Sequence, residues 1–65
     1  MTIRALALRA IEAETAARSA LVGADEYYAA DAAAIDARET FLAALRVNAG
    51  IEPELWDKLT KEGIL

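Results

Sequence analysis

Seventeen of the 65 residues are alanine, and they recur at helical spacings through two long segments. Each segment runs without proline or glycine until it ends at a glycine, Gly23 for the first and Gly50 for the second. Alanine has the strongest intrinsic preference for helix, and its small side chain allows two helices to approach closely. The chain therefore predicts an all-α fold built on two long alanine-rich helices.

The length of the chain limits its core. One small domain, residues 1–65, supplies only ~3–5 kcal/mol of net stability unless a disulfide, a metal or a partner adds to it. Cysteine and histidine are both absent, so disulfides, thiolate ligands and imidazole ligands cannot contribute. Alanine also supplies 17 of the 37 hydrophobic residues, which leaves 20 larger apolar side chains. We therefore expect stability to depend on association.

The first helix is expected over about residues 2–22. Thr2 is its predicted N-cap, because a threonine hydroxyl can accept a free backbone N–H, and Gly23 can adopt the left-handed conformation that commonly ends a helix. Only Gly23 and Ala24 separate this helix from the next. A linker this short predicts an antiparallel helical hairpin.

The second helix is expected over about residues 25–49, with Asp25 as its N-cap and Gly50 as its stop. A short third helix is expected over about residues 53–62. Pro53 favours its first position, because the N–H that proline lacks would be unpaired there in any case. The sequence thus predicts a hairpin of two long helices followed by a short C-terminal helix.

Alanine is expected to line the contact between the two long helices. On the first helix the predicted stripe is Ile3, Leu6, Ala10, Ala13, Ala17 and Ala20. On the second helix its counterpart is Ala30, Ala33, Ala37 and Ala44. Two such stripes would bring the helix axes nearer than the usual ~8–10 Å.

Larger apolar side chains of the second helix are predicted to lie on another flank: Tyr27, Tyr28, Ile35, Phe41, Leu42 and Leu45. The third helix is only ~15 Å long, so it can cover the Phe41 end of this flank but leaves the tyrosine end open. Leu8, Ile11 and Val22 on the first helix also point away from the alanine stripe. An apolar flank that the chain cannot cover predicts a second neighbour.

Two charged residues lie within that flank, Asp31 and Arg38, seven residues apart and therefore on one side of the helix. One interpretation is that they pair with charges on a partner, or with their own symmetry mates, and fix the register of association. The other places them at the edge, with Arg38 extending its guanidinium to water. The predicted protein interface comprises Tyr27, Tyr28, Asp31, Ile35 and Arg38 with Leu8 and Ile11.

Residues that carry catalysis or bind metals are sparse in this chain. Without histidine and cysteine, hydrolytic triads and zinc sites cannot be built in their usual forms. Two carboxylate pairs at three-residue spacing, Asp36 with Glu39 and Glu54 with Asp57, are interpreted as solvated helix faces rather than as sites for a hard cation. We expect no enzymatic activity, no cofactor, no metal and no small-molecule substrate.

The net charge of −4 disfavours nucleic acid and anionic membranes, since both attract basic surfaces. No apolar run reaches the ~18 residues of a membrane-spanning helix. Arg4 and Arg9 interrupt the N-terminal apolar stretch, so it does not form the core of a signal peptide. We expect a protein that is cytoplasmic, or assembled into a particle, and not secreted.

The leading hypothesis is a non-enzymatic protein–protein interaction subunit, a structural or accessory component of a homo-oligomer or of a larger assembly such as a phage particle. The alternative is a small acidic inhibitor or regulator, such as a phage antagonist or an antitoxin-like protein, that occupies a basic site on its target. A third hypothesis treats residues 45–59 as a helix-turn-helix for DNA. Its recognition helix would present Glu54 and Asp57 beside two lysines, which suits a phosphate-lined groove poorly.

Overall fold

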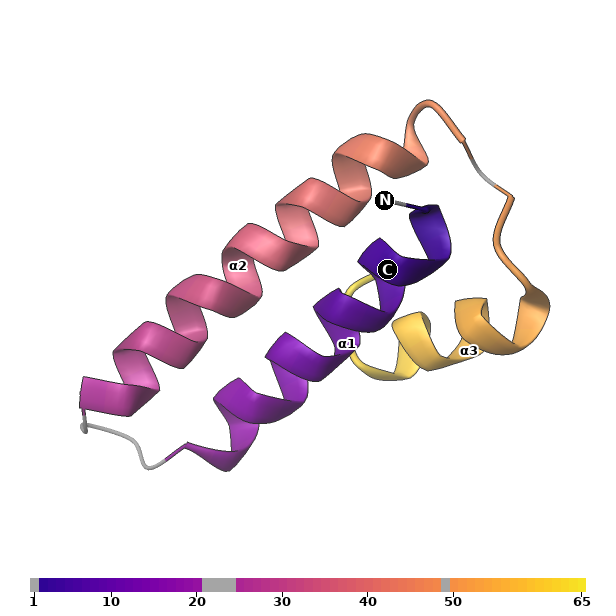
Figure 1. Cartoon of the computed structure of the whole chain (residues 1–65). Coiled ribbons are helices and arrows are strands. Elements are labelled where there is room, and N and C mark those ends of the chain that lie inside the picture. The colour runs from indigo at the N-terminus through magenta and orange to yellow at the C-terminus, as the bar shows by residue number, and fades with distance from the viewer. Residues whose placement is uncertain (1, 21–24, 49) are drawn as a thin grey trace.

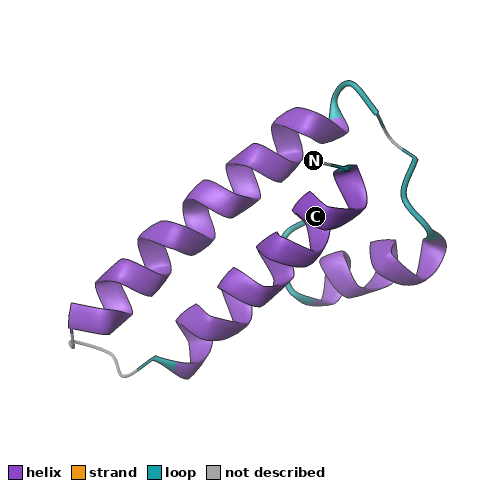
Figure 2. Cartoon of the chain, in the orientation of Figure 1, coloured by secondary structure: helices purple, strands orange, loops and turns teal. Residues whose placement is uncertain are grey.

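The computed structural model of the chain describes residues 2–20, 25–48 and 50–65. Within these ranges the fold is all-helical, without strands, in the order α1 (Ile3–Ser19), α2 (Asp25–Leu45) and α3 (Pro53–Lys61). The two long helices lie side by side and pack along each other, consistent with a hairpin, while α3 packs against α1 (Figure 1). Figure 2 shows the helices and their connections in the same orientation.

Helix α1 begins directly after Thr2. The Ala5 N–H donates to Thr2 Oγ1 at 3.1 Å, which confirms the predicted N-cap. The helix ends at Ser19, short of the predicted end near residue 22, and the Ser19 hydroxyl donates to a carbonyl oxygen one turn back at 3.0 Å. Such side-chain bonds compete with the backbone for helical carbonyls. Val22, the predicted Gly23 cap and the linker that follows it lie outside the described residues.

Helix α2 begins at Asp25, which lies inside the first turn rather than before it, where its charge complements the helix dipole. The helix ends at Leu45, short of the predicted end near residue 49. Asn48 Oδ1 accepts the Gly50 N–H at 3.0 Å, a local turn that competes with helix. Before that turn, the Val47 and Asn48 N–H groups both donate to the Ala44 carbonyl oxygen, at 3.1 and 3.0 Å, which closes the end of α2.

Helix α3 begins at Pro53, as its sequence predicts. Its C-terminus is closed by two backbone bonds: the Gly63 N–H donates to Thr60 O at 3.1 Å and the Ile64 N–H donates to Leu59 O at 3.0 Å. Gly63 has a φ of 77°, so this is a Schellman motif with glycine in the left-handed position. The motif brings Ile64 back to the core, a feature that our reading of the sequence did not predict.

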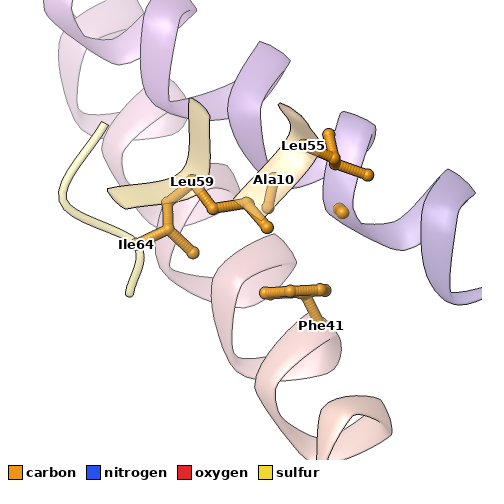
Figure 3. Packing of buried hydrophobic residues seen from close by; sticks show 6 residues of the cluster. Ala10, Phe41, Leu55, Leu59 and Ile64 are labelled. Carbon is orange, nitrogen blue, oxygen red and sulfur yellow. The ribbon is translucent and has the colours of Figure 1, made fainter. Parts of the chain in front are cut away.

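The core lies where the three helices meet, as Figure 3 shows. Its buried residues come from every helix and from the C-terminal tail: Ala7, Ala10, Phe41, Leu55, Leu59 and Ile64. Phe41 and Leu59 are the largest side chains that are fully buried. The prediction that Phe41 lies on a flank away from the helix contact is therefore wrong. Around Phe41, the contact between α1 and α2 packs an aromatic ring near the small side chains of Ala7 and Ala10.

The alanine stripes are only partly as predicted. On α1, Ala10 and Ala17 are buried, and Ala7 joins them. On α2, Ala30, Ala37 and Ala44 are half-buried as the predicted stripe requires, but Ala33 is exposed and its neighbour Ala34 is buried in its place. Burying a large ring stabilises more than burying a methyl group. Phe41 lies four residues after Ala37 and three before Ala44, so the ring extends the alanine face of α2 into the core.

Candidate interaction surface

Helix α2 has a second apolar face that the described chain leaves in water. Tyr28 and Ile35 are 63% and 42% exposed. They are seven residues apart, or two helical turns, so they lie on one side of the helix. Because Ala34 and Phe41 are buried on another side, α2 presents one apolar face to the core and one to solvent.

Tyr27 supports the exposed tyrosine. Its side chain is half-buried, and its ring contacts that of Tyr28 edge to face, with centroids 5.4 Å apart and planes at 75°. Aromatic pairs in this geometry contribute about 0.5–1.5 kcal/mol beyond their buried area. Tyr27 also lines an open pocket together with Ala17 and Arg18 of α1. The ring of Tyr28 is therefore exposed at the surface next to Tyr27, which lies on the side of α2 nearer to α1.

The two charged residues of the predicted interface alternate with the exposed apolar ones along α2, and Asp31 also lines the open pocket that Tyr27 shares with α1. Asp31 is exposed and Arg38 is half-buried. Neither makes a hydrogen bond or an ion pair with any residue that the structure describes. With Tyr28 and Ile35 they recur at intervals of three and four residues. We call these four residues the outer face of α2.

The two predicted residues of α1 lie elsewhere. Leu8 is exposed, and it lines an open pocket with Arg4 of the same helix and with Leu55 and Lys58 of α3. Ile11 is half-buried and packs against the core cluster, so the chain itself covers part of it. Neither belongs to the row that Tyr28, Asp31, Ile35 and Arg38 form along α2. The outer face of α2 is therefore the candidate site.

The sequence-based interface omits three exposed apolar side chains: Val47, Trp56 and Leu65. Trp56 is 43% exposed although it follows the buried Leu55. Successive side chains on a helix point in different directions, and the four-residue spacing of Leu55 and Leu59 identifies the inward side of α3. That spacing was the available signal that Trp56 lies beside the core rather than in it.

The polar side chains of the described residues are all at least partly exposed to solvent. No group of three His, Cys, Asp or Glu residues in that part of the chain lies close enough to hold a metal ion. In the same part of the chain, no helix combines the length and the apolar character needed to cross a membrane.

No protein-family model, curated protein or solved structure matches the chain. The surface that points to a function is the outer face of α2. This face combines exposed apolar side chains with two opposite charges that lack partners among the described residues. Apolar residues flanked by charges along one side of a helix are typical of helix–helix association.

Proposed function

We propose that the protein is a non-enzymatic interaction subunit, a structural or accessory component that packs through the outer face of α2 into a homo-oligomer or a larger particle. The observation that carries this proposal is the exposure of Tyr28 and Ile35 on one side of a single helix. Isolated apolar residues are common on the surfaces of monomers, whereas aligned ones mark sites of association. Residues 46–52 form a longer connection than a helix-turn-helix uses, so DNA binding is not part of the proposal.

In this proposal α1 and α2 form an antiparallel hairpin. Leu6 of α1 lines one pocket with Thr40 of α2, and Ala17 of α1 lines another with Tyr27 of α2. Residues early in α1 thus lie near residues late in α2, and the reverse holds at the other end. An antiparallel pair leaves the outer face of α2 as a continuous helical surface that a neighbour can reach.

The size of the core supports a role for a partner. Phe41 and Leu59 are the only large side chains with less than 2% exposure among the described residues. A domain this small has ~3–5 kcal/mol of net stability. Fully burying one large apolar side chain contributes ~1.5–3 kcal/mol, and because Ile35 and Tyr28 are 42% and 63% exposed, covering the rest of each would add roughly half of that amount. Association would therefore also stabilise the fold.

Sedimentation velocity over a concentration series, with thermal melts of the same samples, tests the proposal. We expect the wild-type protein to associate, and its Tm to rise with concentration. The double variant Tyr28→Ser/Ile35→Ser should remain monomeric and helical. The matched control Ala29→Ser/Ala43→Ser places the same residues at exposed positions of α2 outside the outer face, and it should associate normally.

Two outcomes would contradict the proposal. One is a wild-type protein that melts cooperatively as a monomer with a Tm independent of concentration. The other is association that the Tyr28→Ser/Ile35→Ser variant retains. Raised salt separates apolar packing from the acidic-inhibitor alternative, because contacts between exposed charges weaken with screening while apolar packing does not.

A further inference from the structure

We infer that the partner on the outer face of α2 is a second copy of this chain, related by a two-fold axis close to Ile35. The inference rests on the proposed function and specifies its partner. Its basis is the pair Asp31 and Arg38, two opposite charges on either side of Ile35 along the same helical face, each without a partner among the described residues.

A two-fold axis perpendicular to α2, midway between Asp31 and Arg38, makes these charges complementary to themselves. The axis reverses the direction of the second helix, so Asp31 of each copy faces Arg38 of the other. Both ion pairs form at once. Ile35 then lies beside the axis and packs near its own symmetry mate, while Tyr28 lies toward the outer end of the contact. One helix face thereby supplies both halves of the interface.

The same residues disfavour other arrangements. A parallel pairing in register would set Asp31 against Asp31 and Arg38 against Arg38, and like charges in an interface cost free energy. A partner with a single sign of charge would satisfy only one of the two residues and leave the other opposed by a like charge. The antiparallel pairing of two copies satisfies both. The charge pattern therefore favours a second copy over an acidic or a basic partner.

The length of the outer face along α2 limits the affinity expected for self-association. Tyr28 and Arg38 are ten residues apart, which is ~15 Å along the helix axis. A contact of this length falls below the ~1,200 Å² of total buried area typical of stable interfaces. We therefore expect weak, reversible association in the micromolar range. The apolar residues supply its free energy, and the ion pairs fix its register.

Charge-swap variants test the pairing. Asp31→Arg gives each copy two arginines on the face, and Arg38→Asp gives each copy two aspartates. Each single variant should self-associate at least ~10-fold more weakly than the wild type, because like charges now face each other. An equimolar mixture of the two single variants should form a heterodimer, since every arginine then meets an aspartate. The double variant Asp31→Arg/Arg38→Asp should form a homodimer again.

Sedimentation velocity of each variant and of the mixture measures these outcomes, and native mass spectrometry identifies the heterodimer by mass. Circular dichroism checks that every variant keeps its helices. Glu26→Arg makes the same change in net charge as Asp31→Arg, at an exposed position of α2 outside the outer face. It should associate as the wild type does.

Separate results would overturn the pairing and the proposed function. Association that both single charge variants retain, or a mixture that gives no heterodimer, overturns the two-fold pairing. If that association is nevertheless lost in Tyr28→Ser/Ile35→Ser, the proposed function stands. A wild type that is monomeric at every concentration overturns both.

Discussion

The Ile64 N–H donates to the Leu59 carbonyl oxygen at 3.0 Å, and the side chains of both residues are buried in the core. The motif that ends α3 therefore also adds an apolar side chain to the cluster around Phe41. The C-terminal tail is thus a structural part of the fold. It takes this path because Gly63 adopts a positive φ.

We expect Gly63→Ala to destabilise the protein by about 1 kcal/mol, because an L-residue at a φ of 77° is strained. A Cβ at this position would meet no atom within 4 Å, so the cost comes from the backbone alone. Urea unfolding followed by circular dichroism measures it. Gly63→Asn should recover part of the loss, because asparagine tolerates the left-handed region better than alanine does. Equal stability of the glycine and alanine forms would contradict the assignment.

Phe41→Ala should unfold most of the protein at room temperature. Truncating a buried phenylalanine costs ~3–5 kcal/mol, which is about the whole stability of a domain this small. Far-UV circular dichroism and a thermal melt would show the loss. Leu42→Ala is the matched comparison, because Leu42 is adjacent but only half-buried, and it should cost clearly less. Similar losses in both variants would mean that Phe41 is not central to the core.

Ala10→Leu should destabilise the contact between the helices by about 1–3 kcal/mol, because Ala10 is 1% exposed and a larger side chain would overpack its site. Ala16→Leu makes the same substitution at an exposed position of α1 and should be nearly neutral. The difference in urea midpoint between the two variants isolates packing from helix propensity. No difference would place the close contact elsewhere on α1.

Arg18 joins the end of α3 to α1. Its Nη1 lies 2.6 Å from Glu62 Oε2, and its Nη2 donates to the Glu62 carbonyl oxygen at 2.8 Å. We expect Arg18→Met to loosen the tail, with a local loss of roughly 1 kcal/mol. Faster hydrogen exchange at the Ile64 amide would report it.

Arg4→Met is the control for that measurement. Arg4 pairs with Glu52 at 2.9 Å, but both side chains are more than half exposed, and such pairs contribute only ~0–1 kcal/mol. Exchange at the Ile64 amide should stay unchanged in this variant. Equal effects of the two substitutions on exchange at the Ile64 amide would show that the loss of a positive charge, and not the loss of the Arg18–Glu62 contact, loosens the C-terminal tail.

Local sequence signals predicted where the helices begin. They did not predict the features that depend on contacts between helices. Thr2 and Pro53 act within their own helical turns, so their roles can be inferred without knowing any neighbour. Phe41 lies four residues after Ala37 and three before Ala44, so spacing alone places it on the alanine side of α2. How fully it is buried depends on the surfaces that α1 and α3 offer to it. The prediction took Gly50 as the stop of α2, but the helix ends at Leu45, and the Asn48 side chain then accepts the Gly50 N–H in a local turn.

Some features of the candidate site could likewise be predicted from the sequence, and others could not. Tyr28 and Ile35 are exposed, as the short reach of α3 implied, because that estimate needs only the length of a helix. That a partner covers them stays a prediction. The partial burial of Ile11 could not be inferred from α1 alone, since it depends on how α3 and the C-terminal tail close over the core.

Alanine methyl groups give α1 a nearly uniform surface, along which a facing helix could shift lengthwise by one turn with little change in packing. Phe41 removes that freedom, because its fully buried ring belongs to one cluster with Ala7 and Ala10. A single bulky side chain thus sets the axial alignment of two otherwise repetitive surfaces. Substitutions among the small residues would leave this alignment unchanged as long as Phe41 remained buried in the cluster.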